Sequence, residues 1–278
     1  MKVSQAVIFC LDYHKSNSRK NTVRAYEAIL LKLCEQCGDK HLSELNSEEI
    51  FSFLNQLTEG RKQQTKRSRY SLLSAFFNFV RINIDQSFQN PCDSPMMKKL
   101  FRAKPFTSWE ILEKEVVDEV IFRTTKTRNR LMLELMALGG MRIGEALKLT
   151  PNDINDRKLI IRDPKSGKDS EIVFIPQKVA DRLKEYVREK AIESYQRIFP
   201  ICYEAARAVV KKAGKMVGVR LNPHDLRRFA ATYASRCGVP VEIISKVILR
   251  HANLSITQRY LGKVSDTEAM KWIDNLYS

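Results

Sequence analysis

Apolar side chains recur at every third or fourth position through the first 82 residues, which predicts a series of amphipathic helices. In the clearest case, Val23, Tyr26 and Leu30 fall on one face of a helix. Asn46 and Ser47 are candidate N-caps for the third helix, because their side-chain oxygens can accept hydrogen bonds from its first turn. We expect helices over residues 3–14, 21–37, 47–57 and 63–81.

The second half of the chain mixes helical patterns with a short β-rich region. Residues 158–162 and 170–175 are rich in β-branched side chains, and the segment between them reads DPKSGKD, which is typical of a hairpin turn. The expected fold is therefore mainly α-helical with a small β-hairpin or sheet. Apolar spacing predicts helices over residues 108–123, 127–138, 142–149, 177–194, 203–214, 224–236, 241–249 and 266–276.

Prolines separate the two halves. Pro91, Pro95 and Pro105 interrupt a stretch without helical periodicity, which predicts a linker over residues 91–105. We expect a helical domain over residues 1–90 and a mixed α+β domain over residues 106–278. Two domains also suit a chain of 278 residues.

Charge narrows the classes of partner. The chain has 48 Lys and Arg residues against 32 Asp and Glu residues, a formal charge of +16. This excess favours a polyanion, with nucleic acid before an anionic membrane surface. No apolar run approaches the ~20 residues that span a bilayer, and the N-terminus becomes polar too early for a signal peptide. We expect a cytoplasmic protein without a membrane segment.

The six cysteines are scattered, which favours free thiols in a reducing compartment. Cys34 and Cys37 have the spacing of a zinc-binding pair, and His41 follows. A zinc site needs a fourth ligand and usually a second paired motif, which this chain lacks nearby. Buried helix cysteines are the better interpretation, and we expect neither a metal nor another cofactor.

The densest group of cations stands at the start of the fourth expected helix. Five cations fall within nine residues without an interleaved acid, while the second half of the same helix is apolar. One end can anchor in a core while the other contacts phosphates, or else forms a solvated basic face. The five are Arg61, Lys62, Lys66, Arg67 and Arg69.

Candidate chemistry lies near the end of the chain. His224 and Arg227 follow Pro223 at a helix start and share one face, so they can converge on an anion. His251 precedes Tyr260 in a polar and basic stretch, where positive surroundings favour a phenolate over a phenol.

Three motifs in order resemble the tyrosine recombinase (phage integrase) family. They are Met141-Arg142-Ile-Gly-Glu145, His224-Asp-Leu-Arg227, and His251 followed by Tyr260. The resemblance runs from about Leu131 to Tyr260, and the N-terminal helices look like the core-binding domain of that family. Arg250 stands where the family usually has glycine, and the hairpin turn reads Pro-Lys-Ser-Gly-Lys where the family often has Gly-Lys-Gly.

The resemblance implies a role for each residue of these motifs. Tyr260 attacks the scissile phosphate and forms a 3′-phosphotyrosine. Arg142 and Arg227 bind the non-bridging oxygens. His251 donates a hydrogen bond to the phosphate, and His224 exchanges a proton with the tyrosine. Glu145 orients Arg142 or its helix. A turn lysine protonates the 5′-oxygen, and Lys165 fits this role better than Lys168.

The implied function is a site-specific DNA recombinase that cleaves and rejoins double-stranded DNA. The resemblance also implies that the two domains clamp the duplex and that a tetramer forms on two DNA sites. The segment 266–276 packs either on a neighbouring protomer or within its own chain. The alternatives are a type IB topoisomerase, a non-catalytic DNA-binding regulator or inactive relative, and a membrane-surface or zinc protein.

Overall fold

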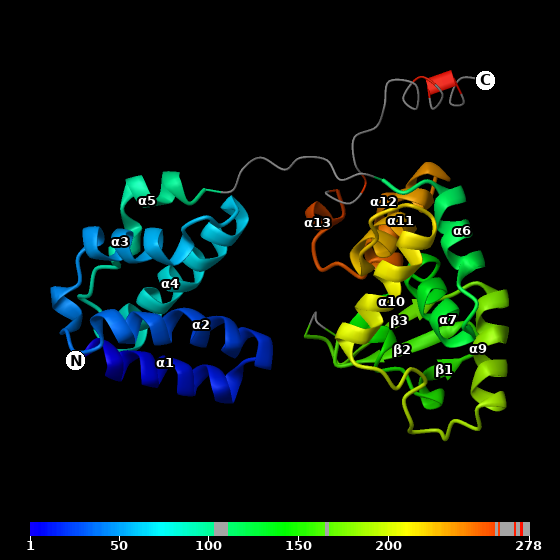
Figure 1. The fold of residues 1–278 in the computed structure, drawn as a ribbon, viewed down its shortest axis with the longest axis horizontal. Helices are drawn as coiled ribbons and strands as arrows, with labels where there is room; N and C mark the ends of the chain where they lie inside the picture. The colour runs from blue at the N-terminus through cyan, green and yellow to red at the C-terminus, as the bar shows by residue number, and fades with distance from the viewer. Residues whose placement is uncertain (103–110, 165–166, 259–260, 262–269, 271–272, 275–278) are drawn as a thin grey trace. The chain divides into compact units, whose positions relative to one another are not determined.

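The computed structural model describes residues 1–102, 111–164, 167–258, 261, 270 and 273–274. The chain divides into two compact units, residues 1–107 and residues 108–278 (Figure 1). Each unit has its own hydrophobic core. Most described residues are helical, and a small antiparallel sheet lies in the second unit, as the sequence predicts.

The N-terminal unit is built on four helices whose apolar stripes meet in one core. Phe76 and Phe77 of the fourth helix are fully buried there, beside Leu30 and Leu33 of the second. Asn46 caps the third helix, because its Oδ1 accepts hydrogen bonds from the first-turn amides. The helices are α1 (Val3–Asn17), α2 (Lys20–Cys37), α3 (Ser47–Thr58) and α4 (Gln63–Asn83), followed by the short α5 (Pro95–Leu100).

The N-terminal unit extends into the segment that the sequence assigns to a linker. Residues Pro91–Asp93 form a 3₁₀ turn that leads to α5, and the side chains of Cys92, Met97 and Phe101 are buried in the N-terminal core. Proline at the first position of a helix starts it rather than breaks it, which explains the difference. Asn90 Oδ1 accepts from the Cys92 amide and holds this turn.

The C-terminal unit surrounds a helix whose second half is buried on all sides. In α7 (Thr127–Ala137), every residue from Leu131 onward is buried, as expected of a helix at the centre of a core. It contacts α6 (Lys114–Arg123), α8 (Ile143–Ala146), α9 (Gln177–Glu189) and α11 (Pro223–Arg236). The remaining helices are α10 (Tyr203–Met216), α12 (Val241–Ile243) and α13 (Leu254–Gln258).

The sheet has the order β1-β2-β3, with strands β1 (Ile154–Asn155), β2 (Lys158–Arg162) and β3 (Ser170–Phe174). The hairpin pairs Leu159 with Val173, and both side chains are buried against the helices. Ile172 and Phe174 face the other way and are exposed. The alternation places one face of the sheet on the core.

Several helix predictions differ from the structure in their bounds. The helix expected over 177–194 ends at Glu189, and the one expected over 3–14 continues to Asn17. The helix expected from residue 108 begins at Lys114, and the one expected over 142–149 has its α-helical part at Ile143–Ala146. The helix expected over 241–249 starts as α12 and continues as a π-helical turn over Ile244–Ile248. The helix expected over 266–276 falls mostly outside the described residues.

Candidate active site

Two glycines after α7 create the turn on which the site is built. Gly140 has a φ of +60°, a conformation that side chains rarely adopt. A Cβ at this position would lie 2.9 Å from the carbonyl oxygen of Ile248. Glycine therefore allows the segment before His251 to approach the turn that precedes Arg142.

Arg142 is the N-cap of α8, and Glu145 holds it at two points. The backbone amide of Arg142 donates to Glu145 Oε2 at 2.9 Å, and its guanidinium donates to Oε1 at 2.5 Å. The Arg142 side chain is 23% exposed, so it still reaches solvent. Glu145 therefore holds both the side chain of Arg142 and the start of α8.

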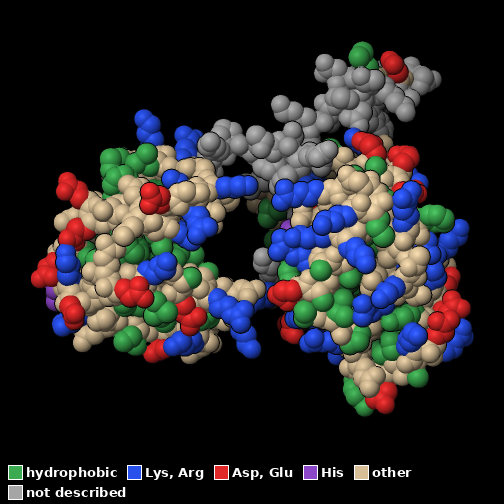
Figure 2. Space-filling view, viewed as in Figure 1, with side chains coloured by type: hydrophobic (Ala, Val, Ile, Leu, Met, Phe, Trp, Pro, Cys, Tyr) green, Lys and Arg blue, Asp and Glu red, His purple; other side chains and the backbone are tan. Residues whose placement is uncertain are grey.

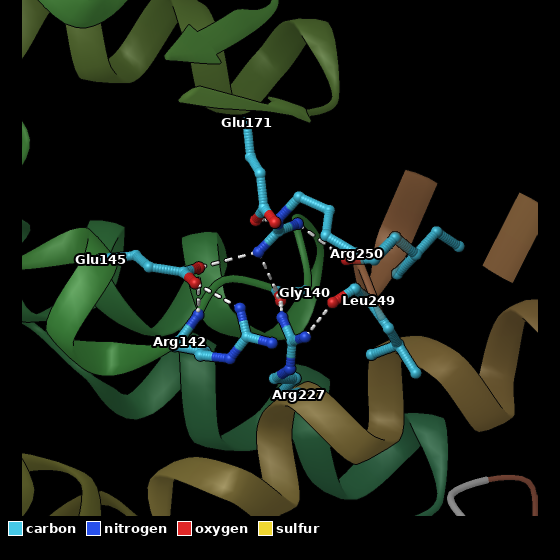
Figure 3. Close-up of polar contacts among 8 residues, drawn as sticks. Gly140, Arg142, Glu145, Glu171, Arg227, Leu249 and Arg250 are labelled. Atoms are coloured by element: carbon cyan, nitrogen blue, oxygen red, sulfur yellow. Dashed lines mark hydrogen bonds and ion pairs between the residues drawn. The ribbon is translucent and has the colours of Figure 1, made fainter. Parts of the chain in front are cut away.

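Arg227 lies on α11 with 1% of its surface exposed. Its guanidinium donates to the carbonyl oxygens of Gly140 and Leu249 (Figure 3). A buried arginine is costly unless its donors are satisfied, and these two carbonyls come from two different loops. Arg227 therefore joins the turn before Arg142 to the segment before His251.

Arg250 completes a ring of charged side chains. It is 6% exposed, and its guanidinium contacts Glu145 Oε2 at 2.7 Å and Glu171 Oε2 at 3.3 Å. Burial alone would raise the pKa of Glu145, but the charges of Arg250 and Arg142 outweigh it and hold that pKa below its ordinary value. Both guanidinium groups therefore face an ionised carboxylate.

His251 is fixed by hydrogen bonds within its own loop. Its amide donates to the carbonyl of Ser245 at 2.9 Å, and its Nδ1 lies 3.0 Å from Thr257 Oγ1. Thr257 Oγ1 also lies 2.8 Å from Ser245 Oγ, so the ring nitrogen and the two hydroxyls form one hydrogen-bonded chain. Burial, then the charges of Arg227, Arg142 and Arg250, lower the pKa of His251 to about 4. The ring is therefore neutral at pH 7.

His224 occupies the first turn of α11, three residues before Arg227. Desolvation lowers its pKa, and the charges of Arg227, Arg142 and Arg228 lower it further. The helix start is fixed by Asp225, whose Oδ2 accepts from the Asn222 amide at 2.8 Å. His224 is thus a neutral imidazole close to the guanidinium groups of Arg227 and Arg142.

The structure brings together four of the six residues that sequence analysis assigns to catalysis. Arg142, Arg227 and His251 are joined through Gly140, Glu145 and the segment around residue 249, and His224 shares α11 with Arg227. The other two, Lys165 and Tyr260, fall outside the described residues. Lys168 is exposed in the turn between β2 and β3.

The five cations assigned to DNA contact belong to the N-terminal unit. Arg61 and Lys62 precede α4, and Lys66 and Arg67 lie on its first turns with at least part of each side chain in solvent. Arg69 differs, because its guanidinium donates to the carbonyl oxygen of Leu57 at the end of α3. It ties two helices of this unit together.

Sequence analysis did not assign roles to Glu171, Ser245, Thr257 or Arg250. The first three carry no motif, and their contacts join segments that are distant along the chain. Arg250 gave one signal, since it replaces a glycine of the related family. In the structure it keeps the glycine-like backbone, with a φ of +51°.

The arrangement can bind an anion, and nothing in the part of the chain that the structure describes resembles a metal site. No group of three or more His, Cys, Asp or Glu residues that could hold a metal ion occurs there. Within the same ranges, no helix is both long and apolar enough to cross a bilayer.

Both units match family models of phage integrases. The phage integrase family matches residues 110–265, and the N-terminal SAM-like domain of phage integrases matches residues 11–82. Tyrosine recombinase XerA of Pyrococcus furiosus is 28% identical over 258 residues, which cover 87% of this chain and 83% of the relative. A tyrosine recombinase of Pseudothermotoga lettingae is 29% identical over 253 residues, or 85% and 83% of the two chains.

Solved structures share the fold at lower identity. The Tn1549 transposon integrase in complex with transposon right end DNA aligns with a TM-score of 0.74 at 14% identity, covering all of both chains. A lambda integrase dimer bound to a COC′ core site aligns with a TM-score of 0.73 at 18% identity, covering 94% of this chain and 95% of that one.

Proposed function

The chain belongs to the phage integrase family and is a tyrosine-type site-specific recombinase, and on that premise we propose that Tyr260 cleaves duplex DNA through a 3′-phosphotyrosine. The observation that carries the proposal is the charged ring around Gly140. It gathers Arg142 and Arg227 beside two neutral histidines, although these residues come from separate segments of the sequence.

Arg142 and Arg227 stabilise the negative charge that collects on the non-bridging oxygens during attack. Planar guanidinium groups match two oxygens of a phosphate at once. Their positions are fixed before DNA binds, by Glu145 in one case and by two backbone carbonyls in the other. Such preorganisation means that no reorientation is needed as charge develops.

Proton transfer accompanies the covalent step. The Tyr260 oxygen attacks phosphorus, the bond from phosphorus to the 5′-oxygen breaks, and the phenol proton passes to His224. The lowered pKa of His224 supports this role, because only a neutral imidazole can accept a proton. The 5′-oxygen takes its proton from Lys165 in the hairpin turn. Rejoining reverses each transfer.

His251 adds a hydrogen bond to the same phosphate. Its Nδ1 is held by Thr257 Oγ1 at 3.0 Å, so Nε2 is the ring nitrogen for the phosphate. A bound phosphate places negative charge beside the ring, which favours the charged imidazolium. DNA binding therefore favours uptake of a proton at His251.

Double-stranded DNA is the partner, and exposed cations of both units hold it. Figure 2 shows Lys and Arg side chains gathered over α10 and α11 of the C-terminal unit. The exposed cations on and after α10 include Lys211, Lys212, Lys215 and Arg220. The α4 cluster adds Arg61, Lys62, Lys66 and Arg67, while Lys168 contacts the backbone near the cleavage point. A tetramer assembles on two DNA sites.

The decisive experiment captures the covalent intermediate on DNA and requires no defined target sequence. The protein is incubated without Mg²⁺ with a library of nicked duplexes of randomised sequence, and adducts that survive SDS are recovered and sequenced. We expect adducts with the wild type and none with Tyr260→Phe. Absence of adducts with the wild type would overturn the proposal.

The recovered duplex then separates the two turn lysines. Lys165→Ala should slow cleavage strongly, and a 5′-bridging phosphorothiolate should restore it, because sulfur leaves without a proton. Lys168→Ala is the matched control, and it should weaken binding with little change in cleavage at saturating protein. Restoration by sulfur in Lys168→Ala alone would move the role to Lys168.

A further inference from the structure

We propose that Arg250 is a positioning residue that sets where the two phosphate-binding arginines lie relative to each other. The proposal rests on the roles proposed above for Arg142 and Arg227. It concerns a buried side chain that replaces a glycine at the position before His251.

Arg250 contacts both of the supports that hold the phosphate-binding arginines. Its Nη2 donates to Glu145 Oε2 at 2.7 Å, and Glu145 orients Arg142. The same nitrogen lies 3.5 Å from the carbonyl oxygen of Gly140, which accepts from Arg227. A continuous chain of hydrogen bonds and polar contacts therefore links Arg142 to Arg227. It passes through Glu145, Arg250 and Gly140 (Figure 3).

The backbone of Arg250 contributes to the same arrangement. Its Nη1 donates to the carbonyl of Ile248 at 2.8 Å, which curls the side chain back over its own loop. The intervening carbonyl, that of Leu249, is then directed at Arg227. The left-handed φ of +51° is unfavourable for a residue with a Cβ, so the side-chain contacts must outweigh this cost.

Arg250 also connects the ring to the β-hairpin. Its Nε lies 3.3 Å from Glu171 Oε2, and both side chains are buried. Glu171 is the second residue of β3, the strand that follows the turn with Lys165 and Lys168 in the sequence. One guanidinium group thus fixes the loop before His251, the start of α8 and the hairpin.

Charge balance offers a simpler explanation for Arg250, and the two explanations make different predictions. Glu171 is a buried carboxylate, so loss of its partner destabilises the fold whatever the arginine does for the reaction. The double variant Arg250→Gly with Glu171→Gln removes that uncompensated charge and relieves the backbone. It therefore tests positioning apart from charge balance.

The experiment measures single-turnover cleavage at saturating protein on the duplex recovered from the library, together with thermal unfolding. Arg250→Gly should lower both the cleavage rate and the unfolding temperature. In the double variant, the unfolding temperature should return to within about 2 °C of Glu171→Gln alone, while cleavage stays roughly 30-fold slower or more, since small misplacements cost that much. Arg250→Lys keeps the charge but not the planar guanidinium group, so its cleavage rate should lie between those of the wild type and Arg250→Gly.

A second substrate reports on the arginines themselves. A methylphosphonate at the cleavage position lacks one charged non-bridging oxygen, so correct placement of Arg142 and Arg227 matters less to its cleavage. The difference between the double variant and Glu171→Gln should shrink to within about threefold on this duplex. A merely structural role would leave the difference the same on both substrates.

The matched control is another buried carboxylate of the same unit. Glu134 is held by Arg182 at 2.7 Å, and this ion pair includes no member of the charged ring. Arg182→Met should lower the unfolding temperature and leave cleavage unchanged. Cleavage by the double variant within about threefold of the wild type would overturn the proposal for Arg250, whereas a wild type that forms no adduct would overturn the proposed function instead.

Discussion

The two units of the chain use charge in opposite ways. Among the described residues, the N-terminal unit buries no charged side chain, and the buried polar groups there are Thr58 and Asn90. Its ion pairs lie at the surface. The described part of the C-terminal unit buries six charged side chains, namely Glu134, Glu145, Asp153, Glu171, Arg227 and Arg250.

The contrast indicates a division between holding DNA and acting on it. Exposed cations gain affinity by releasing counterions, and no single position is decisive. Buried charges cost desolvation energy, so they persist only where their geometry is needed or well compensated. The contrast predicts that changes in the charged ring of the C-terminal unit alter the rate of cleavage. Changes in the α4 cluster should instead alter the salt dependence of DNA affinity.

The largest effect is expected from Arg227→Lys. An ammonium group cannot donate to the Gly140 and Leu249 carbonyls and stabilise the phosphate in the same geometry. Cleavage at saturating protein should fall roughly 10³-fold, or about 4 kcal/mol of transition-state stabilisation. The control is Arg236→Lys in the last turn of the same helix, which should cleave normally. A loss below tenfold for Arg227→Lys would contradict the division.

The next effect concerns stability alone. Phe76 is fully buried in the N-terminal core, so Phe76→Ala should lower the free energy of unfolding of that unit by about 3 kcal/mol. Urea denaturation measures this loss. Well below the unfolding transition and at saturating protein, cleavage should match the wild type. A hundredfold slower reaction under those conditions would show that the N-terminal unit takes part in the chemistry.

A smaller effect is expected from the α4 cluster. Replacing both Lys66 and Arg67 with alanine should reduce the slope of log affinity against log salt by about 2, since each lost phosphate contact removes about 0.9. Lys15→Ala on α1 is the control and should leave the slope unchanged. Arg69→Ala should also lower stability, because Arg69 holds the Leu57 carbonyl. An unchanged slope in the double variant would remove these cations from the DNA contact.

The smallest effect is a pH dependence of stability. Folding lowers the pKa of His251 from 6.5 to about 4, so between these values the unfolded chain binds more protons. The free energy of unfolding should therefore fall as pH falls through this window. His251→Gln should remove roughly 1 kcal/mol of that fall, because solvent screening around the half-buried ring weakens the effect.

Thermal or urea unfolding at pH 6.5 and pH 5 measures the difference between the two proteins. Glu145 contributes little there, because its lowered pKa places its protonation below this range. His224 and His14 also have lowered pKa values and remain in both proteins, so the wild type minus variant difference isolates His251. A pH profile of equal steepness in the variant would contradict a buried, neutral His251.

Local pattern was sufficient to predict most of the helices and the hairpin. The cap at Asn46 and the start of α11 at Pro223 depend on contacts within one turn, which neighbouring residues determine. The pattern misled where burial depends on partners far along the chain. Residues after Pro91 look like a linker until Cys92 and Met97 meet the α3–α4 core.

The residues of the site likewise fall into those that the sequence identifies and those that only the fold reveals. Arg142, His224, Arg227 and His251 could be identified because they form ordered motifs that resemble a family. Arg250 and Glu171 could not, because their contact spans 79 positions and neither residue has a motif of its own. The substituted glycine marked the position of Arg250, but only the fold shows what the arginine contacts.

The side chains of the charged ring have a net charge that can be counted. Arg142, Arg227 and Arg250 carry three positive charges, Glu145 and Glu171 carry two negative charges, and the lowered pKa of His251 keeps its ring neutral. The sum is one unbalanced positive charge, equal and opposite to that of a phosphodiester. A single phosphate balances that charge. A proton taken up by His251 when DNA binds restores one positive charge, which then faces the negative charge that develops on the phosphate during attack.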